Sequence, residues 1–231
     1  MRGRTGPVFR LRGTTAPAVA GAVVLALGIT GCTAPHVYTG EDAAVVARAL
    51  TELTVVDRRV HVLGYTREHF GGWADHWYEH AAGAGMCSTR GIVLLETFGG
   101  TASPTAEATT EQVGSCPTAT GTATDLYSGQ PLTPQDVEVD HVVPLAVAWD
   151  HGAHAWPRHH RVDFANDREL NLLAVSGEQN RHKSDGSLSE WSPPHAGTAC
   201  AYAARYLSVA VRYSLSITKD DKEAAGSACG L

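Results

Sequence analysis

The sequence predicts an α+β fold, and three observations carry this prediction. Apolar side chains recur with helical spacing over residues 41–53, and residues 198–215 are a second candidate for a long helix. The run 137–143 is rich in valine and is stopped by Pro144, which is typical of a strand. Ser176 is a fair N-cap for a short helix through Lys183, with Glu178 in its first turn. The chain therefore combines long helices with a small β component.

The remaining elements follow from local composition. Residues 57–80 are dense in aromatic and charged groups without a clear period, so no element is predicted there. Residues 99–124 are rich in Thr, Ala, Gly and Ser, which is typical of an exposed loop. In chain order we expect a helix over 86–98, that loop with a short strand after Cys116, a turn at 125–129, one or two helical turns over 146–151, a loop over 152–161, a helix over 176–183 and a helix over 219–228.

The first residues resemble a bacterial lipoprotein signal peptide. Four arginines and no acidic residue lie between residues 2 and 12, and an uncharged Ala/Val/Leu/Gly stretch follows over 15–30. That stretch is shorter than the about 20 apolar residues that a membrane-spanning helix needs. It ends in Leu-Gly-Ile-Thr-Gly-Cys, which resembles a lipobox whose cysteine, Cys32, becomes the lipidated first residue of the mature chain. An ordinary secretion signal with an incidental cysteine is the alternative.

These features divide the chain into a signal peptide over 1–31, a polar tether over 32–40 and one domain over 41–231. We expect an exported protein at the outer face of the cytoplasmic membrane, anchored through Cys32, with full secretion as the alternative. Without the signal peptide the chain keeps 14 basic and 24 acidic residues, a formal charge of −10. That balance argues against a protein that coats nucleic acid by bulk charge. A local basic site stays open.

The composition supports one globular core. With 231 residues, 43% hydrophobic and 18% charged, the chain is neither disordered nor collagen-like. Four cysteines remain beyond the lipobox, and an even number in an exported chain indicates disulfides. Three pairings exist, and proximity in sequence favours two loops of similar length, Cys87–Cys116 and Cys200–Cys229.

Polar groups suited to phosphate and metal chemistry concentrate between residues 139 and 194. Asp140 and His141 end the predicted strand on opposite sides, so one can bind a metal while the other faces a substrate if the strand bends there. Asn180 offers a neutral oxygen ligand from the predicted helix. Oxygen ligands of this kind suit Mg²⁺ better than zinc. Arg181 and Lys183 flank that ligand and are suited to phosphate oxygens.

These residues resemble the HNH, or ββα-metal, nuclease motif. The match lies in Asp140-His141, Asn171 and Asn180, with Asn in the third position where many members have His. The wider chain, from about Tyr65 to Cys229, is similar to the secreted bacterial HNH endonuclease family related to the C-terminal domain of GmrSD restriction enzymes. The segments that carry this similarity are 87–90, 125–129, 140–145, 164–167, 180–183 and 190–194. The resemblance implies a ββα-metal core surrounded by helices.

The resemblance also implies roles for individual residues. His141 would be the general base that activates water against a phosphodiester. Asp140 and Asn180 would hold one divalent metal, Mg²⁺ first, with Mn²⁺ or Ca²⁺ as alternatives. Asn171 would orient His141 through its side-chain or main-chain carbonyl and so set the tautomer; Asn166 is the alternative for this role. The products would carry 5′-phosphate and 3′-hydroxyl ends.

Five basic residues are candidates for substrate binding. Arg90 lies beside a cysteine and has an ion-pair role as its alternative, and the cluster at 158–161 has a solvated loop as its alternative. The candidates are Arg90, Arg158, Arg161, Arg181 and Lys183. We expect a monomer that acts on DNA with low sequence specificity, with RNA as a second substrate.

Two other functions compete with the nuclease. His76, Glu79 and His80 match an inverted zinc-peptidase motif, which needs a helix, although glycines flank this segment and a third ligand is not evident. A non-enzymatic surface lipoprotein that binds nucleic acid is the other alternative.

Overall fold

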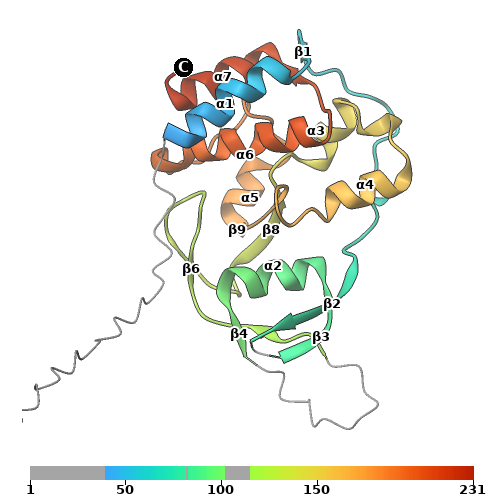
Figure 1. The fold of residues 1–231 in the computed structure, drawn as a ribbon, viewed down its shortest axis with the longest axis vertical. Coiled ribbons are helices and arrows are strands. Elements are labelled where there is room, and N and C mark those ends of the chain that lie inside the picture. Colours follow the sequence, from blue (N-terminus) through green and yellow to red (C-terminus); the bar gives the residue numbers. More distant parts are fainter. Residues whose placement is uncertain (1–39, 82, 102–114) are drawn as a thin grey trace, which may run out of the picture. The chain divides into compact units, whose positions relative to one another are not determined.

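The computed structural model describes residues 40–81, 83–101 and 115–231, and these form a mixed structure of helices and small sheets (Figure 1). The expected signal peptide, Cys32 and nearly all of the tether lie outside the described residues. The α-helices are α1 (Gly40–Glu52), α2 (Thr89–Phe98), α3 (Leu145–Asp150), α4 (Arg158–Ala165), α5 (Gly177–Lys183), α6 (Ala199–Arg212) and α7 (Lys219–Cys229). The 3₁₀ turns are η1 (Arg67–Phe70), η2 (Ala153–Ala155) and η3 (Ala196–Thr198).

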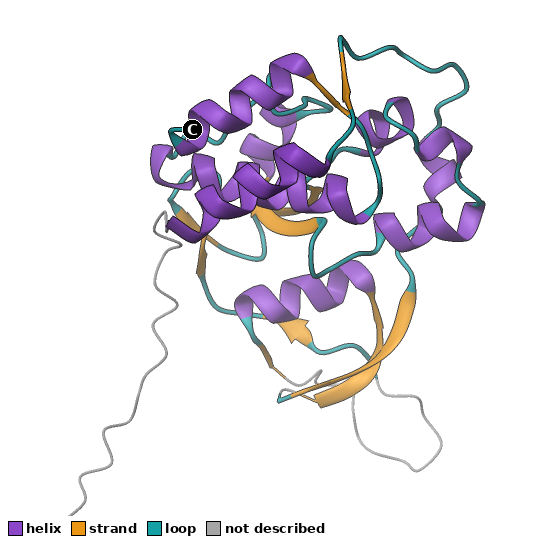
Figure 2. Cartoon of the chain, turned by 45° about the horizontal axis from the view of Figure 1, so that its top comes forward, coloured by secondary structure: helices purple, strands orange, loops and turns teal. Residues whose placement is uncertain are grey.

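The strands of the described residues pair as two-stranded sheets (Figure 2). One pair is parallel and the others are antiparallel. The parallel pair is β1 (Val55–Val56) with β10 (Ile217–Thr218); the antiparallel pairs are β2 (Asp75–His80) with β3 (Gly83–Ser88), β4 (Gly100–Thr101) with β5 (Thr118–Ala119), β6 (Ala123–Thr124) with β7 (Pro131–Leu132), and β8 (Val137–His141) with β9 (Leu172–Ser176).

The β8–β9 pair and α5 form the part of the fold that carries the conspicuous polar residues. β8 and β9 are in register from Val137 opposite Ser176 to His141 opposite Leu172. α5 follows β9 directly, and the Ser176 hydroxyl accepts a hydrogen bond from Gln179 N at 3.3 Å. Ser176 is thus the N-cap that the sequence predicts.

Alternation along β8 divides its side chains between two environments. Val137 and Val139 pack with α2 residues in one apolar cluster, while Glu138 and Asp140 lie on the opposite face with α5. β8 pairs with β9 along one edge and, among the described residues, has no strand partner along its other edge. A cavity lies beside β8, and side chains from both faces of the strand line it.

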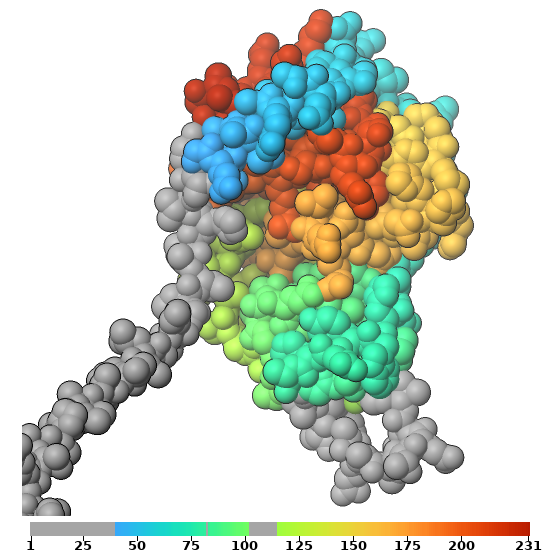
Figure 3. Space-filling view, viewed as in Figure 1, coloured from blue at the N-terminus to red at the C-terminus, as the bar shows by residue number. Residues whose placement is uncertain are grey.

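The larger core lies among α1, α3, α4, α6 and α7. The helical repeat of α1 buries Val46 and Ala49, and α1 packs along α6 and α7 (Figure 3). The disulfide Cys200–Cys229 joins α6 to α7, and Cys87–Cys116 joins the end of β3 to the segment before β5. The pairing that proximity favours is confirmed. In the described residues, no helix combines the length and the apolar character that crossing a bilayer requires.

The structure corrects the prediction of a loop over 152–161. η2 and the first half of α4 occupy this stretch, and α4 begins directly after Pro157. The buried apolar residues of α4, Phe164 and Ala165, lie in its last turn. The expected loop therefore holds no amphipathic repeat that sequence periodicity could detect.

Candidate active site

A cavity of about 560 Å³ lies along the free edge of β8. It gathers residues from η1, α2, β8 and α5, which are far apart in the sequence. Five of the sequence-predicted site residues line it: Arg90, Asp140, His141, Asn180 and Arg181. Arg67 and Glu138 line it as well, although the sequence analysis did not select them.

His141 is buried and presents a defined tautomer. Its Nε2 lies 2.9 Å from the carbonyl oxygen of Ala165. A carbonyl can only accept a hydrogen bond, so Nε2 carries the proton and Nδ1 carries the lone pair. Within the described part of the chain, Nδ1 has no hydrogen-bond partner. Because it is not among the atoms that are buried without a partner, and because His141 lines the cavity, we infer that Nδ1 is accessible from the cavity. Burial lowers the pKa of His141 to about 3, against the opposing effect of the Ala165 carbonyl, which keeps the ring neutral near pH 7.

The orienting contact differs from the expected one. The carbonyl that binds His141 belongs to Ala165, and neither carbonyl of Asn171 makes that contact. The side-chain oxygen of Asn171 accepts from Val143 N at 2.9 Å, and its amide nitrogen donates to Phe164 O at 3.2 Å. Asn171 thus ties the segment after His141 to the end of α4, next to Ala165, and acts on His141 only through the backbone.

Asn166 positions Trp73, whose ring stacks on the imidazole of His141. The ring of Trp73 is parallel to that of His141, with centroids 5.6 Å apart. Asn166 accepts a hydrogen bond from Ala74 N at 2.9 Å and donates to Gly72 O at 3.2 Å, so it binds the chain on both sides of Trp73. The two motif asparagines therefore position different neighbours of the same imidazole.

Asp140 divides its two carboxylate oxygens between the fold and the cavity. Oδ2 accepts from Tyr127 Oη at 2.6 Å and from Lys183 Nζ at 2.7 Å. The other oxygen, Oδ1, has no hydrogen-bond partner in the described residues and is accessible rather than buried. Lys183 is fully buried and also donates to His141 O. Burial lowers the pKa of Lys183 and Asp140 opposes this. Lys183 is therefore an internal partner of Asp140, which corrects its predicted role in substrate binding.

Asn180 has the same one-sided arrangement. Its Nδ2 donates to Glu138 Oε2 at 2.7 Å, and its Oδ1 has no partner among the described residues. Asp140 and Asn180 thus offer one oxygen each to the same cavity, a donor set that fits a hydrated Mg²⁺. The described residues hold no group of three His, Cys, Asp or Glu side chains that could bind a metal.

The predicted basic residues separate into two groups. Arg90 and Arg181 line the cavity, and Arg67 from η1 joins them. Arg161 does not, because its guanidinium donates to the backbone carbonyls of His69, Ala153 and Trp156. Arg158 is exposed on α4 outside the cavity.

The zinc-peptidase alternative is wrong in its geometry. His76, Glu79 and His80 lie on strand β2, where side chains alternate between faces. Glu79 is therefore opposite the two histidines, and the helix that the motif needs is replaced by a strand.

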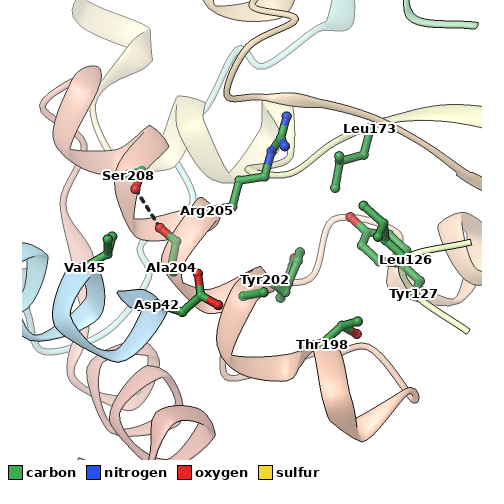
Figure 4. A pocket seen from close by; sticks show the side chains of 11 residues that line it. Asp42, Val45, Leu126, Tyr127, Leu173, Thr198, Tyr202, Ala204, Arg205 and Ser208 are labelled. Atoms are coloured by element: carbon green, nitrogen blue, oxygen red, sulfur yellow. Dashed lines mark hydrogen bonds between the residues drawn. The ribbon is translucent and has the colours of Figure 1, made fainter. Parts of the chain in front are cut away.

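A second cavity, of about 240 Å³, lies between α1, α6 and the 126–127 turn (Figure 4). Its lining is mostly apolar, with Asp42 and Arg205 as the charged members. Arg205 is engaged with the backbone carbonyls of Glu169, Leu170 and Leu172. None of the predicted catalytic or metal residues lines this cavity, so the cavity beside β8 is the candidate active site.

Comparison with known proteins supports the resemblance in the sequence. The family model described as "GmrSD restriction endonucleases, C-terminal domain" matches residues 107–225, slightly more than half of the chain. A protein of the fungus Arthroderma benhamiae, called "Uncharacterized secreted protein", is 35% identical over 167 residues, which cover 71% of this chain and 74% of the relative. No solved structure matches.

The relative bears on origin and export. It is fungal, so it gives no support to the bacterial origin that the sequence analysis expects. Its description as secreted, together with the two disulfides, fits an exported protein.

Proposed function

This chain belongs to the family of the C-terminal domain of GmrSD restriction endonucleases, and we propose on that basis that it is an exported, metal-dependent endonuclease of the HNH type. One observation carries the proposal: a neutral histidine with an available lone pair faces the same cavity as two free oxygen ligands and three arginines. β8, β9 and α5 would be the ββα-metal core.

The chain's own groups suit hydrolysis of a phosphodiester. Arg67, Arg90 and Arg181 bind and orient the phosphate through charge-assisted hydrogen bonds. His141 Nδ1 takes a proton from a water molecule as the water oxygen attacks phosphorus. The bond from phosphorus to the 3′ oxygen breaks, and the 3′ oxygen takes a proton from solvent. The products are a 5′-phosphate and a 3′-hydroxyl.

The metal would be held by Oδ1 of Asp140 and Oδ1 of Asn180, with water and substrate completing the set. Mg²⁺ is the first candidate, with Mn²⁺ or Ca²⁺ as alternatives. A bound divalent ion supplies positive charge that stabilises the negative charge developing on the phosphate and on the leaving oxygen.

The decisive experiment is a nuclease assay with a metal panel. We expect the purified protein to act as a monomer. With both disulfides formed, it is incubated with plasmid DNA or with RNA, in the presence of Mg²⁺, Mn²⁺ or Ca²⁺. We expect cleavage with little sequence preference, and a loss of at least about 100-fold in His141→Ala, because general-base catalysis contributes about 10²–10⁴. His159→Ala, an exposed histidine on α4, is the matched control. Cleavage that persists in His141→Ala, or that is absent with every metal, would refute the assignment. Metal-independent binding without turnover would favour a binding protein instead.

We also propose that the chain is anchored to the outer face of the cytoplasmic membrane through lipid on Cys32. The support is the resemblance of the N-terminal 32 residues to a lipoprotein signal peptide. Lipid on Cys32 would anchor the chain stably, because two or three acyl chains hold a protein at a membrane where one does not. Mass spectrometry of the mature N-terminus tests this. An acylated N-terminal Cys32 is expected, whereas an unmodified N-terminus at another residue indicates an ordinary secretion signal.

A further inference from the structure

Glu138 is a charged residue of the cavity to which the proposed mechanism gives no role. It lies two residues before Asp140 on β8, so both side chains project from the same face of the strand. Each of its carboxylate oxygens accepts a hydrogen bond: Oε2 from Asn180 Nδ2 and Oε1 from Arg181 Nη1, each at 2.7 Å. The carboxylate therefore lies between the proposed metal ligand and a proposed phosphate-binding group.

The chemistry of an amide makes the first of these contacts decisive. Only the oxygen of an asparagine side chain can coordinate a cation, because the NH₂ group is a donor. An ionised carboxylate can only accept hydrogen bonds. Glu138 therefore selects the rotamer in which Nδ2 of Asn180 faces the strand, and this leaves Oδ1 for the cavity. Without Glu138, the amide is free to rotate between a ligating and a non-ligating orientation.

The local backbone leaves room for this contact. A Cβ atom at Gly177, the first residue of α5, would lie 2.8 Å from Glu138 Oε1 and 2.8 Å from Arg181 Nη1. The absence of a side chain at this position lets the carboxylate reach α5 between the end of β9 and the first turn of the helix. The three residues thus form one closely packed unit.

We propose that Glu138 is the positioning residue of the metal site, acting through Asn180 rather than as a ligand. The proposal rests on the proposed metal-dependent function. It differs from direct coordination, because both oxygens of Glu138 already accept short hydrogen bonds from protein groups. It predicts that metal binding depends on an acceptor at position 138 and not on a negative charge there.

The test measures Mn²⁺ binding to the purified full chain without substrate, by the EPR signal of free Mn²⁺. Residues that orient metal ligands typically contribute 10- to 100-fold to metal affinity, so Glu138→Ala is expected to weaken Mn²⁺ binding by about 10-fold or more. Glu138→Gln keeps an acceptor for Asn180 Nδ2 and is expected to stay within about 3-fold of the wild type, well short of that range. Glu96→Gln is the matched control, since Glu96 is an exposed ion-pair partner of Arg168 outside the cavity. Thermal melts check that each variant is folded.

A double-mutant cycle identifies the residue through which Glu138 acts. Asn180→Ala should weaken Mn²⁺ binding, and Glu138→Ala should cause no further loss in the Asn180→Ala background. Additive losses would mean that Glu138 acts independently of Asn180, and a Glu138→Gln variant as weak as Glu138→Ala would mean that the negative charge is what matters; either result would overturn the proposal. Unchanged binding in Glu138→Ala would overturn it while leaving the nuclease function intact. A wild-type chain that binds no Mn²⁺ would refute the metal site and this inference together.

Discussion

At the residue scale, three cavity residues share one design. His141, Asp140 and Asn180 each use one polar atom to bind the protein and keep the other for the cavity. The bound atom fixes the orientation of the side chain, so the free atom is placed before any ligand arrives. Such preorganisation avoids the entropy loss of ordering a side chain on binding.

Trp73 should matter for turnover although it forms no polar contact with His141. Replacing it with Ala removes the parallel ring that flanks the imidazole, and small misplacements of a catalytic group cost up to about 10²-fold. We expect Trp73→Ala to lower kcat by about 10-fold or more with KM nearly unchanged, and Trp73→Phe to retain most of the rate. Steady-state kinetics on DNA check this. A change confined to KM would show that Trp73 binds substrate instead.

At the scale of elements, hydrogen bonds join segments that are distant in the sequence. Asp221 lies in the first turn of α7, where it completes a capping box with Thr218. The same carboxylate accepts from Ser187 Oγ at 2.6 Å and from Ser189 N at 2.9 Å. It therefore ties α7 to the segment that follows α5.

The Asp221 contacts predict a pH-dependent contribution to stability. Burial raises the pKa of Asp221, but hydrogen bonds from Ser187, Ser189 and Thr218 outweigh it and hold the pKa below its ordinary value of 3.8. The stabilisation is therefore complete above pH 3.8 and is lost as the pH falls through the lower folded-state pKa. Asp221→Asn should cost about 2 kcal/mol at pH 7. Urea unfolding from pH 7 to pH 2 should show the difference between the two proteins shrinking at the acid end; a constant difference would contradict the argument.

The Cys200–Cys229 disulfide staples α6 to α7, two helices of the larger core. It closes a loop with a sequence separation of 29 residues, for which chain entropy gives about 3–4 kcal/mol. Replacing both cysteines with Ala should lower the free energy of unfolding by about that amount in urea titrations. An unchanged midpoint would show that helix packing alone fixes α7.

At the scale of the whole molecule, a strongly acidic chain places three arginines at the candidate active site, among the carboxylates of Glu138, Asp140 and Asp185. Residues 32–231 have a formal charge of −10, so we expect attraction to nucleic acid to depend on local groups of basic residues, first among them the arginines at the cavity. Few phosphate contacts and an unfavourable bulk charge predict loose binding and rapid release of product rather than tight residence.

Salt dependence measures these contacts. Each neutralised phosphate contributes a slope of about 0.7–0.9 in log K against log salt, so three arginines should weaken DNA binding about 20- to 40-fold between about 50 and 200 mM salt. The inactive His141→Ala variant allows the measurement. Arg67→Ala should reduce the slope by about one contact, and Arg158→Ala, outside the cavity, should leave it unchanged. An equal effect of both variants would contradict the assignment of the cavity.

Several elements could be predicted because their signals are local. The repeat of α1, the N-cap at Ser176 and the proximity of the cysteine pairs all lie within a few turns or one loop of sequence. β9 could not be predicted, since its apolar residues 172–175 run without alternation. α4 could not be predicted either, because its apolar residues gather at one end and give no helical repeat.

The candidate site divides in the same way. Asp140, His141 and Asn180 carry a motif and were selected from the sequence, and the structure brings them to one cavity. Glu138 had a usable signal, its spacing of two from Asp140 on a strand. Arg67 and Trp73 had none, because each reaches the site through tertiary contacts across more than 20 residues of chain. Ala165 lies in the segment 164–167 that carries the resemblance, but only the structure shows that its backbone carbonyl contacts His141.

By itself, the sequence determined which residue types are present for chemistry, the family, most of the helices and the exported character of the chain. The tertiary structure alone decided which atom of each residue faces the cavity. It pairs Lys183 with Asp140 in the interior and directs the Arg161 guanidinium to backbone carbonyls. It also shows that the carbonyl that contacts His141 is that of Ala165. Residue type specifies what a group can do, whereas burial and hydrogen-bond partners, which depend on distant segments, determine which of its atoms remain free to do it.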